Sequence, residues 1–190
     1  SIDSFTKSDN GLLHNIPQFT YLIDDSGEIV YSILKDVNLY NTTDIITVPA
    51  IEGKVFEYTI NGDKIITIAN LDNDLRLYFD ETHIAENGIF IKNTTDDYFD
   101  IDIDNDLFSG WKRVDNLASY TTGNKVFQFG ILPNSNTCYI QFPQDITNLI
   151  GDGLQICYTV SNGENGNIKS NVITTFYADQ TSGYGDQTKV

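Results

Sequence analysis

Apolar residues in this chain recur at every second position over short stretches, which is the spacing of β-strands with one buried face. Val, Ile, Tyr, Phe and Thr dominate these stretches, and strands favour such side chains. The pattern predicts strands at residues 19–23, 28–34, 44–48, 54–60, 64–68, 76–79, 88–92, 98–104, 111–114, 126–129, 137–142, 154–160 and 172–176. Since no stretch of about a dozen residues has the spacing of an amphipathic helix, the chain is predicted to be mainly β.

Turn residues separate several of these stretches. The cluster at residues 24–27 predicts a hairpin, and Asn61-Gly62 between two apolar runs is the stronger hairpin signal. Two short segments are predicted to form helical turns, residues 81–87 and residues 144–150. Gly151 follows the second segment at the place where a helix C-terminus favours glycine.

The strand spacing predicts an antiparallel sandwich, an open barrel or two small β modules, with one or two short helical turns. Polar residues at 70–74 predict a boundary between an N-terminal β module, residues 1–69, and a second β module, residues 70–177. Residues 178–190 are rich in Gly, Gln, Ser, Thr and Asp, and they are predicted to form a flexible tail or linker.

Composition and charge restrict the class of partner. Of the 190 residues, 40% are hydrophobic, which is enough for a core, so the disordered class is excluded. The 27 acidic and 11 basic residues give a net charge of −16, which disfavours nucleic acid and an anionic membrane surface and favours a basic patch on a protein partner. The sequence has no Met, which is typical of a piece of a longer polypeptide; a chain trimmed by a protease is the competing explanation.

Four aspartates at alternate positions suggest a calcium site, because Ca²⁺ prefers carboxylate oxygens. These aspartates are Asp100, Asp102, Asp104 and Asp106. The EF-hand pattern fails, because Asn105 and Trp111 occupy the places of its glycine and its glutamate. The alternation is explained better as the solvated face of a strand, so no metal is predicted.

The sequence offers little for catalysis. It contains two histidines, His14 and His83, and none of the short motifs that place a nucleophile, a zinc ion or a phosphate. Cys138 and Cys157 lie in apolar runs and are predicted to be small buried side chains. Because the chain has 27 acidic residues, a pair of carboxylates picked from the sequence does not indicate a glycoside-hydrolysing site. No catalytic residue and no cofactor are therefore predicted.

The C-terminal half resembles a known family in several short motifs. Ile140 and Phe142 form an Ile-x-Phe pair, and a Gly-Asp-Gly turn precedes a strand that ends in Tyr-x-x-x-x-Gly-x-x-Gly-Asn. The residues of the turn and of this ending are Gly151, Asp152, Gly153, Tyr158, Gly163, Gly166 and Asn167. Residues 46–49, residues 52–55 and Trp111 with residues 115–117 match further segments. Over roughly residues 44–176, the chain resembles the baseplate-J-like and baseplate wedge proteins of tailed bacteriophages.

The resemblance departs from the family in one loop, because residues 143–150 separate the Ile-x-Phe strand from the Gly-Asp-Gly turn. It implies a structural subunit of the tail baseplate that docks other baseplate or tail proteins. It further implies a homo-oligomer in the assembled particle, a place in the virion and assembly in the host cytoplasm. The family implies no catalytic residue. The glycines and Asn167 are interpreted as turn residues that fix the fold.

Two other classes of function remain open from the sequence. The first is a carbohydrate-binding or adhesion module of a phage or bacterial surface protein, for which Trp111 and eleven Tyr residues could supply stacking platforms. The second is a glycan hydrolase, which requires a cleft with two facing carboxylates.

Overall fold

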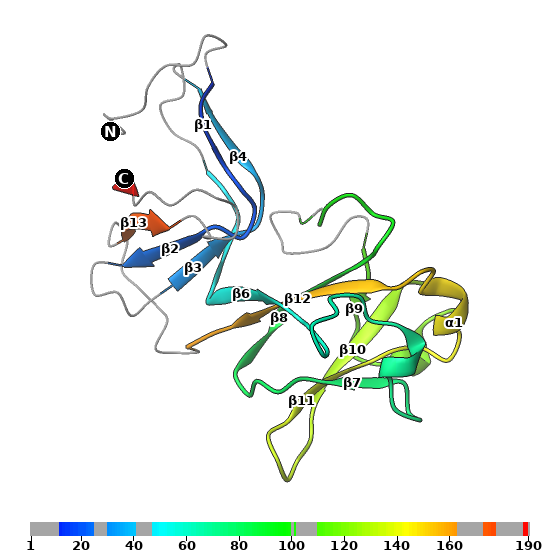
Figure 1. Cartoon of the computed structure of the whole chain (residues 1–190). Helices are drawn as coiled ribbons and strands as arrows, with labels where there is room; N and C mark the ends of the chain where they lie inside the picture. Colours follow the sequence, from blue (N-terminus) through cyan, green and yellow to red (C-terminus); the bar gives the residue numbers. More distant parts are fainter. Residues whose placement is uncertain are drawn as a thin grey trace. The chain divides into compact units, whose positions relative to one another are not determined.

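The computed structural model describes residues 12–24, 30–40, 47–99, 101, 110–162, 173–177 and 188–189. They belong to two units, which are described separately. Unit 1 combines residues 1–54 with residues 161–190, and unit 2 is the continuous segment 55–160. The predicted mainly β fold is confirmed, because strands dominate both units (Figure 1).

Unit 1 contains two antiparallel sheets. β1 (Leu12–Ile16) pairs with β4 (Val37–Tyr40) in the smaller sheet. The larger sheet has the order β14-β13-β2-β3-β5. Its strands are β2 (Tyr21–Asp24), β3 (Val30–Ile33), β5 (Ala50–Glu52), β13 (Ile173–Tyr177) and β14 (Thr188–Lys189). β2 and β3 form the hairpin predicted around residues 24–27.

Among the described residues of unit 1, one hydrophobic cluster forms between the strands. Ile33 and Val37 are buried, with Ile16, Leu22 and Val48 packed against them. Side chains tie the strands together around this core. Ser32 Oγ donates to the carbonyl oxygen of Gly53 at 2.9 Å.

Unit 2 contains two sheets that share one core. The three-stranded sheet has the order β6-β12-β8 (Figure 1), and its strands are β6 (Lys54–Glu57), β8 (Ile84–Asn93) and β12 (Leu154–Val160). The four-stranded sheet has the order β7-β11-β10-β9. Its strands are β7 (Arg76–Tyr78), β9 (Lys112–Arg113), β10 (Val126–Ile131) and β11 (Cys138–Gln141). β9 pairs with β10 in parallel, whereas β10 with β11 and β11 with β7 are antiparallel.

Side chains from both sheets of unit 2 meet in a single hydrophobic cluster, which is the arrangement of a β-sandwich. The buried members are Ile66, Leu77, Phe79, Ile84, Ile89, Ile91, Trp111, Phe127, Cys138, Ile140, Phe142, Ile146, Ile150, Leu154 and Ile156. Trp111 stacks edge to face against Phe142 with 5.3 Å between ring centroids. The Ile-x-Phe pair of the sequence, Ile140 and Phe142, therefore points into the core.

Asn93 joins three parts of unit 2. Its Oδ1 accepts a hydrogen bond from Trp111 Nε1 at 3.1 Å, and its Nδ2 donates to the carbonyl oxygens of Leu149 and Ile150. Leu149 ends the short helix α1 (Ile146–Leu149). Because Asn93 is buried, losing its side chain would leave buried polar groups without partners.

Of the two helical turns predicted from the sequence, one is confirmed and one is wrong, and two short helices were missed. α1 confirms the helical turn predicted at residues 144–150, and Gly151 follows it with φ +58°. Two 3-10 helices, η1 (Ile68–Asn70) and η2 (Leu117–Ser119), were not predicted. The helical turn predicted at residues 81–87 is wrong, because β8 already begins at Ile84 and pairs with β12 there.

Several predicted strands differ from the structure. At the Asn61-Gly62 turn both residues have positive φ, but the ladder is limited to the Ile60–Asp63 bridge. Residues 64–68 form no strand, because Ile66 instead makes an isolated bridge with Leu154. Residues 47–49 are not part of a strand, and residues 44–46 lie outside the described residues. β1 and β4 were not predicted.

The division of the chain differs from the predicted boundary at residue 70. The structure divides the chain after Lys54 and after Val160, since the segment 55–69 belongs with the strands that follow it. Tyr58 N, for example, donates to the carbonyl oxygen of Ile156 in β12 at 2.8 Å. In the predicted tail, Thr188–Lys189 forms β14, and the other residues of 178–190 lie outside the described part of the chain.

Candidate functional site

Of the predicted motif residues that the structure describes, Gly151, Asp152 and Gly153 precede β12 and Tyr158 lies within it. Gly151, Asp152 and Gly153 make the turn that leads into Leu154, with φ +58° at Gly151 and φ +149° at Gly153. Gly153 N donates to the carbonyl oxygen of Ile150 at 3.1 Å. Gly163, Gly166 and Asn167 lie outside the described residues.

Tyr158 lies near the other end of β12, in a cluster of aromatic rings. Its ring centroid is 5.3 Å from that of Phe79, 5.9 Å from that of Phe56 and 6.4 Å from that of Tyr58. Partial burial is the main cause that raises the pKa of Tyr158, and the charges of Glu81 and Asp80 add to it. The Tyr158 side chain therefore stays neutral and packs among the rings of this cluster.

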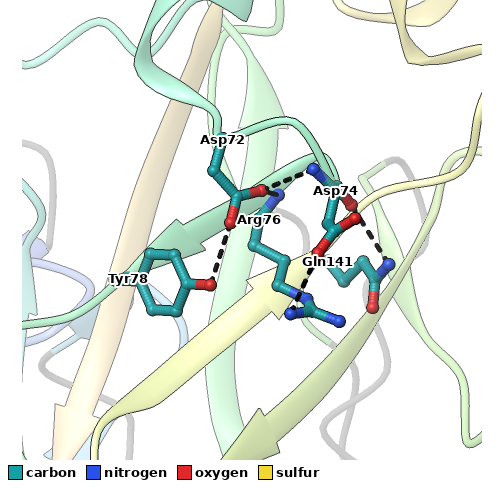
Figure 2. Close-up of polar contacts among 5 residues, drawn as sticks. All are labelled: Asp72, Asp74, Arg76, Tyr78 and Gln141. Atoms are coloured by element: carbon teal, nitrogen blue, oxygen red, sulfur yellow. Dashed lines mark hydrogen bonds and ion pairs between the residues drawn. The ribbon is translucent and has the colours of Figure 1, made fainter. Parts of the chain in front are cut away.

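Polar and aromatic side chains of β7, β11 and the loop before β7 lie close together on the outer side of the four-stranded sheet, and Figure 2 shows the polar contacts among five of them. Leu77 of β7 and Ile140 of β11 point into the core, so their neighbours along each strand point outward. We call this surface the Arg76 patch and define it by Asp72, Asp74, Arg76, Tyr78, Tyr139 and Gln141. The antiparallel register places Tyr139 opposite Tyr78 and Gln141 opposite Arg76.

Asp72 organises the loop that leads into β7. Its Oδ1 accepts hydrogen bonds from the backbone N–H groups of Asp74 and Arg76, each at 2.9 Å. Its Oδ2 accepts from Tyr78 Oη at 2.9 Å (Figure 2). Desolvation tends to raise the pKa of Asp72, but the hydrogen bonds from Arg76, Tyr78 and Asp74 and the charge of Arg76 outweigh it. The pKa therefore lies below its ordinary value.

The same loop contains a strained residue, because Leu75 has φ +61°. This region is unfavourable for a branched side chain and costs on the order of 1–3 kcal/mol. The conformation is held on both sides, since Leu75 N donates to the Asp72 carbonyl and Phe142 N donates to the Leu75 carbonyl, each at 3.0 Å. Leu75 also packs against the core. These two hydrogen bonds and the packing of Leu75 hold the loop in this conformation.

Arg76 lies between a carboxylate and an aromatic ring. Its Nη1 is 3.3 Å from Asp74 Oδ2, and its guanidinium lies 5.0 Å from the ring centroid of Tyr139. Gln141 Nε2 donates to the carbonyl oxygen of Asp74 at 3.1 Å (Figure 2). Arg76 Nε is a buried donor that has no hydrogen-bond partner among the described residues.

Gly130 of β10 makes room for the Tyr139 ring. A Cβ at this position would overlap the outer atoms of that ring. Tyr139 also lies 5.9 Å from Tyr78, measured between ring centroids. The Tyr139 ring therefore packs against the backbone of Gly130 and lies beside the ring of Tyr78.

Other candidate chemistry from the sequence falls outside this patch. Within the described residues, no group of three or more His, Cys, Asp or Glu side chains could hold a metal ion. Asp100, Asp102, Asp104 and Asp106 lie outside them, whereas Ile101 between them is buried. No helix among the described residues is long and apolar enough to span a membrane.

The two cysteines are free and buried, as predicted. Burial is the main cause that raises the pKa of Cys157 to about 12 and the pKa of Cys138 above its ordinary value. His83 is exposed, and its Nδ1 lies 3.0 Å from Thr82 Oγ1.

Comparisons of the chain with protein-family models, with curated proteins and with solved structures found no match.

Proposed function

We propose that this chain is a structural component of a phage tail baseplate, a fragment of a wedge-type subunit that docks neighbouring tail proteins. The observation that carries the proposal is the Arg76 patch, a rigid surface of Arg, Tyr and Gln side chains on the outer face of a sheet. The short motifs described under Sequence analysis support the baseplate assignment. The partners would be other baseplate or tail proteins, with several copies of the chain in one particle.

Arg76, Tyr78 and Tyr139 belong to the residue types that are enriched at protein interfaces, whereas Asp72 and Asp74 belong to a depleted type and serve here to hold the loop and the guanidinium. Arg76 carries five N–H donors and is held by Asp74 through Nη1, so donors remain for acceptor groups on a partner.

The order of the patch also favours docking. Binding is weakened when side chains and loops must be ordered at the interface. Here Asp72 already fixes the loop and Tyr78, while Gly130 and Tyr78 support the Tyr139 ring. The net charge of −16 would steer the chain toward a basic surface on its neighbour.

The location is tested on purified phage particles that carry the gene for this chain. Immunogold labelling with an antibody against the chain is expected to mark the tail end that bears the baseplate. Absence of the chain from purified particles, or labelling of the head alone, would overturn the baseplate assignment.

The docking surface is tested separately, by the amount of chain incorporated per particle. Tyr139→Ala removes the central ring of the patch and is expected to lower incorporation about tenfold. Tyr98→Ala is the matched control, because Tyr98 is also a tyrosine of unit 2 and its side chain is 65% exposed outside the patch. Equal incorporation of both variants and the wild type would remove the patch as the docking surface, even where the labelling places the chain in the baseplate.

A further inference from the structure

Unit 2 carries a half-open hollow of about 330 Å³ next to the Arg76 patch. It is lined by residues 117, 118 and 120–122 of one segment, by residues 141–145 of another, and by Val126. Gln141 belongs both to the hollow and to the Arg76 patch. The volume lies at the lower end of the range of roughly 300–1,000 Å³ that is typical of small-molecule sites.

Hydrogen bonds hold the walls of the hollow in place. Asp145 Oδ2 accepts from the backbone N–H of Gly123 at 2.7 Å, which joins the two lining segments. Asn116 Oδ1 accepts from Ala118 N at 2.9 Å and caps η2, the first part of one wall. Gln141 is oriented by its hydrogen bond to the Asp74 carbonyl. These hydrogen bonds order the walls of the hollow, so little further ordering is required when a ligand binds.

The lining combines one aromatic ring with neutral polar groups. Tyr120 is 49% exposed, although an aromatic side chain of this size is usually packed. Gln141 and Gln144 contribute amides, and Thr121 and Thr122 contribute hydroxyls. Val126 and Phe142, which are buried members of the core, supply apolar lining.

The charge of the lining disfavours an anionic ligand. Asp145 is the one charged residue among those that line it, so the lining offers no cation to an anion. The chain as a whole has a net charge of −16, which adds long-range repulsion. A purely apolar ligand is also unfavourable, because the amides and hydroxyls would lose their hydrogen bonds to water without replacement.

We propose that this hollow binds a neutral saccharide. A sugar ring has an apolar C–H face that packs on an aromatic ring, and hydroxyl groups around its edge that hydrogen-bond to amides, hydroxyls and a carboxylate. Tyr120 provides the ring, and Gln144, Thr121 and Asp145 provide groups for the edge. This activity goes beyond baseplate docking and does not depend on it, since its residues other than Gln141 lie outside the Arg76 patch.

The ligand is tested with the full chain by calorimetric titration against short oligosaccharides of glucose, galactose, mannose and N-acetylglucosamine. Saturable one-site binding is expected for at least one of them. The matched charged probe is an oligoglucuronate of the same length as the glucose probe. Where glucose binds, glucuronate is expected to bind about tenfold more weakly, with the difference shrinking as salt rises. No binding to any neutral probe would overturn the proposal, as would equal binding of both members of this pair.

The position of the site is tested with exposed side chains, whose replacement leaves the core intact. Tyr120→Ala is expected to lower the affinity about tenfold, and Gln144→Ala about fivefold. Tyr98→Ala and Tyr139→Ala are expected to bind like the wild type, since neither residue lines the hollow. If Tyr120→Ala binds the saccharide with the affinity of the wild type, the saccharide binds elsewhere and this site is overturned.

A competing occupant is a peptide segment of a neighbouring tail protein. It predicts that Tyr120→Ala lowers incorporation into particles while no saccharide binds. That combination would assign the hollow to protein docking and overturn the saccharide proposal. Emission of Trp111, the single tryptophan and a buried core residue, verifies that each variant is folded.

Discussion

At the scale of single residues, Asp72 does most to order the candidate docking surface. Its carboxylate accepts two backbone N–H groups and one phenol, which together hold the strained Leu75 loop and the Tyr78 ring. These donors favour the charged form of the carboxyl group, and the pKa of Asp72 falls below 3.8 as a result. The order of the loop is therefore linked to pH.

A pH titration followed by NMR tests this linkage. A group whose pKa is lowered by folding contributes stability that is complete above its unfolded value and is lost as pH falls through the folded value. We expect the backbone amide signal of Arg76 to shift with a midpoint below pH 3.8. In Asp72→Asn this shift should disappear, because the titrating group is gone. A midpoint at or above 3.8 in the wild type would contradict the assignment.

The two cysteines give a second prediction at this scale. Thiolate is the reactive form, and burial raises the pKa of Cys157 to about 12 and that of Cys138 above its ordinary value. In the folded chain at pH 8, we expect both thiols to resist iodoacetamide and Cys157 to react more slowly than Cys138. Mass spectrometry of the alkylated peptides measures both rates, and unfolding in guanidinium should make them equal. Faster reaction of Cys157 would show that its burial is overcome by local opening.

At the scale of elements, the turn into β12 shows what two neighbouring glycines contribute. Both have positive φ, but their surroundings differ. A Cβ at Gly151 would meet only Asn93 Nδ2 at 3.6 Å, whereas a Cβ at Gly153 would overlap the Ile65 side chain and lie 3.1 Å from the Ile66 carbonyl oxygen. The close approach at Gly153 is what allows Ile66 and Leu154 to exchange backbone hydrogen bonds.

Alanine substitutions separate these two contributions. Gly151→Ala should lower the free energy of unfolding by about 1 kcal/mol, the cost of the left-handed conformation for an L-residue. Gly153→Ala should cost more, about 2–4 kcal/mol, because an overlap with the Ile65 side chain and a tight contact with the Ile66 carbonyl oxygen are added to the unfavourable φ. Urea denaturation monitored by Trp111 emission gives both values. Equal costs would mean that the Ile66 backbone moves away freely.

Strands and helices were predicted accurately where the residues that determine them are close together in the sequence. β12 was predicted with its observed bounds because a continuous apolar run follows a glycine turn, and α1 was predicted from the glycine beyond it. β8 was predicted too short because its first half contains the exposed Glu86 and Asn87, which have no strand signal of their own. There, pairing with β12 overrides local preference.

The candidate site could not be predicted from the sequence for the same reason. The strands that carry Arg76 and Tyr139 were both predicted, but their pairing joins segments about sixty residues apart. The alternating pattern shows which residues of one strand share a face of the sheet. It does not show which other strand pairs with that strand. Asp72 was read as part of a boundary, because a polar loop and a loop that organises a surface have the same composition.

At the scale of the whole molecule, the two units differ in which parts of the sequence they are built from. Unit 1 needs both ends of the sequence, because β13 pairs with β2 across more than a hundred residues. Unit 2 is one continuous segment with its own core and both of its sheets. Its strands find all their described partners within the same segment, apart from the first residue of β6.

We therefore expect a chain of residues 53–162 to fold alone. Trp111 reports on this unit without labelling, because it is the single tryptophan and is fully buried in the unit 2 core. Its emission maximum should be as blue-shifted in residues 53–162 as in the full chain, with the same urea midpoint. The opposite truncation, residues 1–54, loses β13 and β14 and should unfold less cooperatively by circular dichroism than the full chain, since β2 becomes an edge strand of a sheet reduced from five strands to three. A red-shifted Trp111 in the 53–162 chain would mean that the core of unit 2 requires unit 1, and the two units would then have to be treated as one folding unit.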